Sequence, residues 1–244
     1  MSLLEEAIAA HGGLERWSAV DEVVLDARSG GAAPTMKLKR RAVARYRARI
    51  STREPRTVIS PLPRPGQRGV FTADSVRIET DEGDVVAERR DARSRFPGGR
   101  RALWWDHLDL VYFAGYALWG YACAPFVFAR EGFETREIEP WEEGGETWRR
   151  LAVTFPADVP AHSREQTFAF DRRGLLRRND YTAEVFGRWA RGAHYVSDHR
   201  EFDGIVFPTR RRVYPRTRSG RRLPGPLIVR IDLDDVRLVS GARG

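Results

Sequence analysis

Three short runs of polar residues contain the side chains best suited to acid–base chemistry. They are residues 162–166, 179–181 and 198–201. In the third run His199 stands between Asp198 and a second carboxylate two residues on, and the second run ends in Tyr181. A histidine close to carboxylates can act as a general base near neutral pH. His199, Asp198 and Tyr181 are therefore the candidate catalytic or orienting residues.

The same runs have a simpler explanation as ion pairs across an exposed sheet face. If Phe170 pairs with Leu175 across the turn between them, Glu165 lies opposite Asp180 on the next strand. Exposed pairs of this kind are common and individually weak. Ion-pair networks outnumber active sites, so ion pairing is the default interpretation of these residues.

No sequence motif indicates a cofactor or a metal. The chain has no GxGxxG before a helix, no Walker loop, no HExxH and no GxSxG. His162 and His199 lack a third ligand at a useful spacing. The single cysteine, Cys123, lies in an apolar stretch without a basic neighbour, which favours a buried small hydrophobe over a nucleophile. We predict no cofactor and no metal ion.

An aromatic stretch between the two halves of the chain indicates a different kind of site. Tyr112, Tyr116 and Trp119 fall at helical spacing and would share one face of a helix. Core packing is the default explanation, but each polar tip needs a partner, which a ligand cavity would also supply. The candidate ligand-binding residues are Trp104, Trp105, Tyr112, Tyr116, Trp119, Tyr121 and Phe126.

Residues 110–129 carry no charge, and about 20 apolar residues are enough to span a bilayer. Gly115, Gly120 and Pro125 interrupt this stretch, and its aromatic residues are not confined to two belts. We therefore expect a helix buried against the concave face of a sheet. A third hypothesis is a membrane-surface protein that dips this stretch into lipid and places arginines on anionic headgroups.

The net positive charge does not by itself indicate a nucleic-acid partner. The net charge is +8, and Lys37 and Lys39 are the only lysines, so the cations are almost all arginine and are spread along the whole chain. No helix-turn-helix, RRM-like or zinc-knuckle pattern accompanies them, so we expect no specific nucleic-acid partner. Glu5 and Glu6 stand where a signal peptide would be apolar, which predicts a cytoplasmic protein.

The elements that would position these residues are mainly strands. Ser2 and Glu5 form a capping-box pattern before a short helix that ends at a pair of glycines. Period-two alternation then predicts antiparallel strands, with hairpin turns at residues 171–174 and 203–204. In the second half the expected strands are 149–155, 165–170, 175–182, 193–202, 205–214 and 227–233. Strands and helices do not alternate, so residues 1–244 are predicted to form one mainly β domain.

Parts of the chain resemble LolA/LolB-like proteins. Residues 11–17 (HGGLERW) are similar to the start of that family, which often has two glycines and an aromatic residue before the first strand. Residues 194–209 (HYVSDHREFDGIVFPT) resemble its recurrent strand, Asp-Gly turn and proline hairpin. Residues 112–117 (YFAGYA) and 124–126 (APF) also look like a group of uncharacterised bacterial proteins of similar length.

The resemblance implies a strongly curved antiparallel sheet, a half-open barrel, with helices covering its concave face. In that family the cavity takes acyl chains or other hydrophobic ligands. A relative in pigment biosynthesis uses the same cavity to steer a reactive aromatic intermediate without a cofactor. The sequence shows neither the signal peptide nor the lipobox cysteine of the lipoprotein carriers, which speaks against periplasmic lipoprotein transport.

We therefore predict a cytoplasmic protein that binds a hydrophobic or aromatic small molecule, or an acyl chain, in a half-barrel cavity. The alternative is a cofactor-independent enzyme on the same fold, of an isomerase or cyclase type, that steers a hydrophobic intermediate. The sequence leaves open which ligand is bound, whether it is turned over and which oligomer forms.

Overall fold

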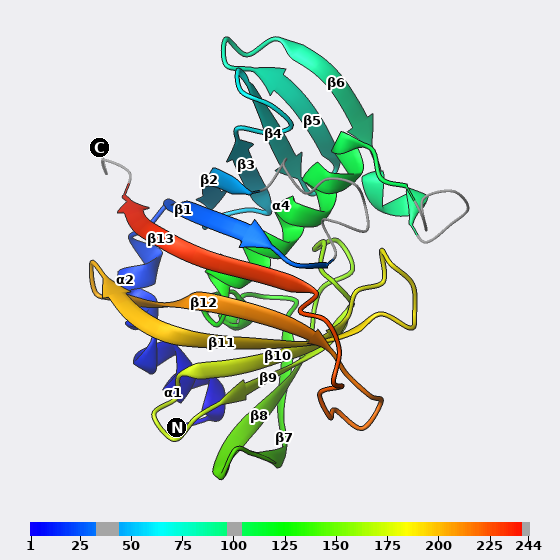
Figure 1. The fold of residues 1–244 in the computed structure, drawn as a ribbon. Coiled ribbons are helices and arrows are strands. Elements are labelled where there is room, and N and C mark those ends of the chain that lie inside the picture. Colours follow the sequence, from blue (N-terminus) through cyan, green and yellow to red (C-terminus); the bar gives the residue numbers. More distant parts are fainter. Residues whose placement is uncertain (33–43, 97–103, 241–244) are drawn as a thin grey trace.

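The computed structural model describes residues 1–32, 44–96 and 104–240, and its main feature is a 13-stranded antiparallel sheet (Figure 1). The strand order is β6-β5-β4-β3-β2-β1-β13-β12-β11-β10-β9-β8-β7. The strands are β1 (Glu22–Gly30), β2 (Arg45–Ser51), β3 (Arg56–Ser60), β4 (Gln67–Thr72), β5 (Ser75–Thr80), β6 (Val85–Arg90), β7 (Glu134–Glu143), β8 (Glu146–Thr154), β9 (Glu165–Phe170), β10 (Leu176–Thr182), β11 (Arg191–Phe202), β12 (Ile205–Pro215) and β13 (Val229–Val239). The helices are α1 (Leu3–Ala10), α2 (Leu14–Ser18), α4 (His107–Cys123) and the short 3-10 turns η1 (Ala92–Arg95) and η3 (Phe126–Ala129).

The first and last strands join the two halves of the sheet. β1 pairs with β13 on one side and with β2 on the other, so β1–β6 form one meander and β7–β13 another. The expected mainly β, antiparallel architecture is confirmed. The sheet is open, however, with β6 and β7 at its edges, and it is not strongly curled into the expected half-barrel (Figure 1). Both edge strands are largely exposed and rich in charged residues, which disfavours their pairing with each other.

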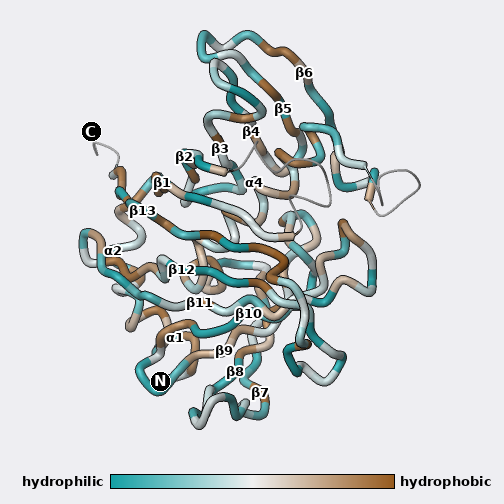
Figure 2. The backbone as a smooth tube through the Cα atoms, in the orientation of Figure 1, coloured by the Kyte–Doolittle hydropathy of each residue, from teal (hydrophilic) through white to brown (hydrophobic). Residues whose placement is uncertain are grey.

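Strand β2 shows why alternating residues build this sheet. Ala48 and Ile50 are fully buried on one face, while Arg47 and Arg49 project from the other. Arg47 pairs with Asp26 on the neighbouring strand at 2.7 Å. Hydrophilic and hydrophobic residues alternate along many strands in the same way (Figure 2). The outer face therefore carries charged side chains that form ion pairs and contact water. The inner face is apolar and is covered by the helices.

Helix α4 packs on the inner face of β2–β6. It begins at a capping box, in which the Asp106 side chain accepts from the Asp109 backbone N–H at 2.9 Å and the Asp109 side chain accepts in return at 3.0 Å. Arg89 of β6 donates to the buried Asp109 carboxylate at 2.7 Å. The helix ends at Cys123, ahead of Pro125, which lacks the N–H needed to continue it.

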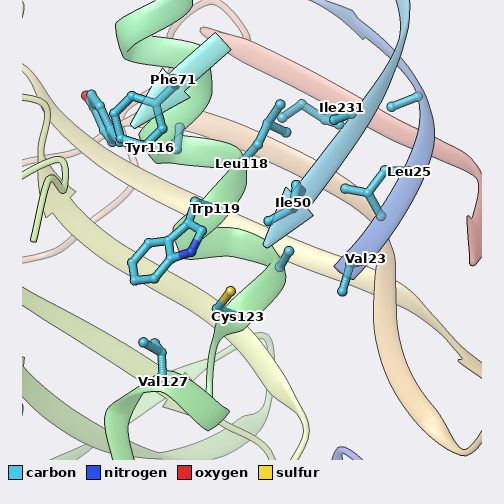
Figure 3. Packing of buried hydrophobic residues seen from close by; sticks show 14 of the residues in the cluster. Val23, Leu25, Ile50, Phe71, Tyr116, Leu118, Trp119, Cys123, Val127 and Ile231 are labelled. Carbon is cyan, nitrogen blue, oxygen red and sulfur yellow. The ribbon is translucent and has the colours of Figure 1, made fainter. Parts of the chain in front are cut away.

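The expectation of a helix buried against a sheet is confirmed. Leu118 and Trp119 of α4 lie beside Ile50 of β2 in the core (Figure 3). Within the described residues no helix is both long enough and apolar enough to cross a membrane. Most of residues 110–129 are buried, so contact of this stretch with lipid would require the core to open.

Strand β7 is an element that the sequence analysis does not predict. Its residues, ETREIEPWEE, are mostly exposed and show no period-two alternation. The pairing of β7 with β8 is also interrupted between Ile138 and Trp141, where Pro140 removes a backbone donor. An edge strand with one neighbour tolerates both features, and neither leaves a pattern in the sequence.

The closest approach of α4 to the sheet gives a first prediction. A Cβ on Gly115 would lie 2.3 Å from the Phe71 Cβ, whereas a Cβ on Gly120 would meet nothing within 4 Å. We expect Gly115→Ala to lower the free energy of unfolding by about 1–3 kcal/mol through overpacking. Gly120→Ala in the same helix should raise it by about 0.5–1 kcal/mol. Urea denaturation of both variants tests this, and equal stabilisation by both would rule out the close contact.

Candidate ligand site

Three buried polar side chains and the partly buried Tyr121 meet where the last turns of α4 face the second half of the sheet. The Tyr116 hydroxyl lies 3.2 Å from His162 Nδ1, and the Tyr121 hydroxyl lies 2.7 Å from His162 Nε2. The Tyr121 hydroxyl is also 3.1 Å from the Tyr181 hydroxyl, and the His162 ring stacks on the Tyr181 ring at 3.8 Å. We call Tyr116, Tyr121, His162 and Tyr181 the Tyr–His cluster.

Separate elements supply the members of the Tyr–His cluster. Tyr116 and Tyr121 come from α4, Tyr181 comes from β10, and His162 comes from the segment between β8 and β9. Tyr181 points inward because it alternates with Asp180, which faces the outer side and pairs with Arg178 at 2.7 Å. The cluster therefore exists only when α4 is seated on the sheet.

The Tyr–His cluster is uncharged at neutral pH. Burial lowers the pKa of His162 to about 3, with Arg93 adding to the effect, and burial raises the pKa of Tyr121 to about 12. A neutral imidazole offers one donor and one acceptor. One of the two tyrosines must therefore donate to His162 while the other accepts from it, which gives a continuous chain of hydrogen bonds through four side chains.

A small, partly open cavity adjoins this cluster. Its volume is about 20 Å³, which is room for one water molecule. Polar and apolar side chains both line it, since Gln166 and Asn179 reach it from β9 and β10 and bond to each other at 3.2 Å. The cavity is lined by Tyr116, Ala117, Gly120, Tyr121, Phe155, Pro160, Ala161, His162, Gln166, Phe168 and Asn179.

Two further polar side chains lie against Tyr121. Arg211 of β12 is only 4% exposed, and it donates to the Tyr121 carbonyl at 2.9 Å. Burial lowers the pKa of Arg211 to about 10. The His194 ring packs against the Tyr121 ring at 4.4 Å, and neither of its ring nitrogens has a hydrogen-bond partner among the described residues. A buried group without a partner costs about 1–3 kcal/mol, so His194 marks an incompletely satisfied region.

The sequence analysis does not single out His194 or Arg211, and it names His162 individually only as a metal ligand, although His162 begins one of the polar runs suited to acid–base chemistry. Arg211 is hidden inside a run of three arginines, although alternation with Val213 places it on the inner face of β12. His194 would have been found by the same alternation along β11, since Val196 is also buried. Within the described residues no group of three or more potential ligands could hold a metal ion.

The predicted ligand-binding residues divide into several groups. Tyr116 and Tyr121 line the cavity. Tyr112 packs against Phe71 with ring centroids 5.9 Å apart, and Trp119 Nε1 donates to the Ser51 carbonyl at 3.1 Å. These last two contacts lie in the core between α4 and the sheet.

The remaining three predicted residues lie outside the cavity lining. The Phe126 ring stacks on Trp17 of α2 at 4.4 Å, and Trp105 contacts Phe186 at 4.7 Å. Trp104 is 64% exposed. Helical spacing alone therefore does not separate residues that line the cavity from residues that only fill the core.

The structure does not bring the three predicted catalytic residues together. Tyr181 belongs to the Tyr–His cluster and pairs with Gly192 at the start of β11. His199 lies seven residues further along β11, which is ~20 Å at the usual rise of a strand. The His199 Nε2 instead lies 2.9 Å from the Leu176 carbonyl, and burial lowers the pKa of His199 to about 4.

Ion pairing accounts for Asp198 and Asp180 among the carboxylates of these runs. Asp198 adopts a positive φ of 55° at a break in the β11 ladder, and its carboxylate pairs with Arg210 at 3.3 Å. The expected pairing of Glu165 with Asp180 is wrong, because Thr167 lies opposite Asp180. Phe170 lies opposite Leu176 and not Leu175, and a bulge between Leu176 and Arg178 shifts the register of β10 by one more residue.

Comparison with known proteins supports the fold. No family model matches the chain, and no curated protein matches it in sequence. A LolA superfamily protein of Nitrosomonas europaea superimposes with a TM-score of 0.55 at 14% identity, covering 98% of this chain and 92% of that one. The chain has a LolA-like fold. The resemblance found in the sequence is thus confirmed at the level of the fold.

Two other solved structures have the same LolA-like arrangement. A putative outer membrane lipoprotein-sorting protein domain of Vibrio parahaemolyticus matches with a TM-score of 0.55 at 10% identity, over 99% of this chain and 92% of its own. A DUF1329 family protein of Desulfovibrio piger matches with a TM-score of 0.53 at 14% identity, over 97% and 91%. At such low identities these likenesses concern the fold alone.

The neutral His162 predicts a definite pH dependence of stability. The unfolded chain protonates this histidine near pH 6.5, while the folded protein resists protonation down to about pH 3. The unfolded state therefore binds more protons in that window, and the free energy of unfolding should fall as the pH falls from 6.5 toward 3. His199, with its pKa lowered to about 4, contributes in the same direction.

Urea denaturation at several pH values measures this effect. We expect His162→Gln to lower stability at pH 7 but to make the fall between pH 6.5 and pH 4 shallower than in the parent protein. An unchanged slope in His162→Gln would show that His162 is not held neutral by the fold.

Proposed function

We propose that this protein binds a hydrophobic or aromatic small molecule, or an acyl chain, between helix α4 and the sheet at the Tyr–His cluster. The observation that carries the proposal is the partly open cavity, which is lined both by apolar residues such as Phe155 and Phe168 and by Tyr116 and Tyr121. A mostly apolar chamber with a few placed polar groups is typical of small-molecule sites.

The polar content of this interior supports a binding role over simple packing. Replacing a buried hydrogen-bonded cluster by apolar side chains of the same shape is often neutral or stabilising. Stability alone therefore gives no reason to keep His162 and Tyr121 there. His194, with two unpartnered ring nitrogens beside Tyr121, adds polar groups that a bound molecule or water could satisfy.

The cavity must widen before an acyl chain can enter, since its volume is about 20 Å³. The wall most suited to move is the segment between β8 and β9, which supplies Ala161 and His162. Beyond the cluster itself, this segment is held by Arg93, which donates to the Ala161 carbonyl at 3.1 Å. The backbone N–H of Glu184 also donates to the His162 carbonyl at 3.1 Å. Ser163 of the same segment accepts from the Thr182 N–H at 3.2 Å and from the Gln166 side chain at 3.1 Å, so widening the cavity must break several hydrogen bonds.

The alternative, a cofactor-independent enzyme of an isomerase or cyclase type, finds support in one feature. The hydrogen-bond chain from Tyr116 through His162 and Tyr121 to Tyr181 could move a proton at the cavity wall. In that case His162 takes the role that the sequence assigned to His199. A cytoplasmic location for either function stays a prediction.

Filling the cavity tests the binding proposal without deleting core atoms. Gly120 lines the cavity and has open space at its Cβ position, so Gly120→Leu should place a side chain into the chamber while improving helix propensity. We expect the parent protein to bind the neutral dye Nile red at one molecule per chain. Gly120→Leu should weaken this binding at least about tenfold, which corresponds to about 1.4 kcal/mol.

The matched control is Ala9→Leu, which adds the same side chain on an exposed position of helix α1. It should leave dye binding unchanged. Thermal melts of both variants should stay cooperative. Absence of dye binding by the folded parent, or equal binding by parent and Gly120→Leu, would remove the proposed chamber.

A further inference from the structure

An open cleft lies at the end of the sheet where β10 stops and β11 begins. Its volume is about 700 Å³. The loop between β10 and β11 and the loop after β12 reach this same end (Figure 1). The cleft is lined by Ser163, Arg164, Glu165, Thr182, Glu184, Arg188, Trp189, Arg191 and Arg218.

Four arginines line this cleft without ion-pair partners among the described residues. They are Arg164, Arg188, Arg191 and Arg218. The segments 33–43 and 97–103 contain no Asp or Glu, so they add no side-chain carboxylate that could neutralise the four. On the outer sheet face, by contrast, Arg28 pairs with Asp234 at 2.7 Å, as many other arginines pair with carboxylates there.

The carboxylates in the cleft do not balance these cations. Glu184 is paired with Arg93 on the other side of the loop, which leaves Glu165 as the lining carboxylate available to offset the charge. Unpaired like charges that share one concavity repel one another and raise the local concentration of anions. The cleft is therefore built to accept negative charge.

An exposed aromatic side chain stands among these arginines. Trp189 is 72% exposed and lines the same cleft. Arginine presents a planar fork of donors that matches phosphate and carboxylate, and an indole offers a flat apolar surface beside it. The combination suits a ligand whose anionic group adjoins an apolar part.

The cleft adjoins the partly open cavity. His162 lines the cavity and the next residue, Ser163, lines the cleft. Thr182 also lines the cleft, and its backbone N–H donates to the Ser163 hydroxyl at 3.2 Å. Consecutive residues of one segment therefore line the two spaces, and a ligand that displaces this segment would extend from one into the other.

We propose that the four arginines bind the anionic phosphate or carboxylate headgroup of an amphiphile whose apolar part occupies the cavity. This inference rests on the proposed function and adds the chemical class of its ligand. The headgroup stays at the surface, with the guanidinium groups as its counter-ions and Trp189 against the first part of its chain.

The experiment compares three probes by isothermal titration calorimetry: dodecyl phosphate, dodecanol and inorganic phosphate. We expect the parent protein to bind dodecyl phosphate at least about tenfold more tightly than dodecanol, as one or two charge-assisted hydrogen bonds supply. The triple variant Arg188→Gln, Arg191→Gln, Arg218→Gln should lose this preference and keep its affinity for dodecanol.

The control variant removes the same number of charges at the opposite ends of the same strands. It carries Arg172→Gln, Arg173→Gln and Arg200→Gln, at exposed residues near the β9–β10 turn and the end of β11. It should keep the preference for dodecyl phosphate. Loss of the preference in both variants would assign it to net charge rather than to the cleft.

The outcomes separate the two proposals. Equal binding of dodecyl phosphate and dodecanol would overturn the headgroup site and leave the hydrophobic site standing. Binding of neither dodecyl probe would overturn the proposed function. Inorganic phosphate that binds as tightly as dodecyl phosphate would show a site for free anions, and the amphiphile would be the wrong ligand.

Discussion

Helix α4 is held on the sheet by side chains that donate hydrogen bonds to its backbone carbonyls. The candidate site depends on the position that these bonds give the helix. The Thr57 hydroxyl donates to the Gly115 carbonyl at 3.0 Å, and Arg211 donates to the Tyr121 carbonyl at 2.9 Å. Hydrophobic contact is non-directional, so an apolar helix on an apolar sheet could slide or turn at small cost. These bonds, together with Phe71 directly under Gly115, fix both its rotation and its position along the strands.

The Arg211 contact also explains how this cation is stabilised in the interior without a carboxylate partner among the described residues. Tyr121 lies in the last turns of α4, where free carbonyls carry the negative end of the helix dipole. The guanidinium carbon lies 5.1 Å from the centre of the Tyr121 ring, which adds a cation–π attraction. Because the helix end and the ring together stabilise Arg211, the neighbouring Tyr–His cluster needs no carboxylate and stays neutral.

Local patterns in the sequence predict the structural features that depend only on residues close together in the chain. The capping box of Ser2 and Glu5 forms as expected, and so does the hairpin turn at residues 203–204. The contact of His162 with Tyr181 is not predictable in this way, because it depends on strand register and on the path of a loop. A bulge in β10 contributes to that register, and the pattern of residues near Arg178 does not predict this bulge.

The division between a neutral interior and a charged opening fixes how a ligand would lie. Taking an unpaired charge into the interior costs several kcal/mol, and the cation buried there, Arg211, already donates to a helix carbonyl. An anionic group inside the cavity would also face His162, which burial keeps uncharged at neutral pH. An amphiphile bound as proposed would therefore have its charge stabilised outside, near Arg188 and Arg191, while its apolar part gains free energy inside. The fold thus favours a single orientation, with the tail buried and the headgroup exposed.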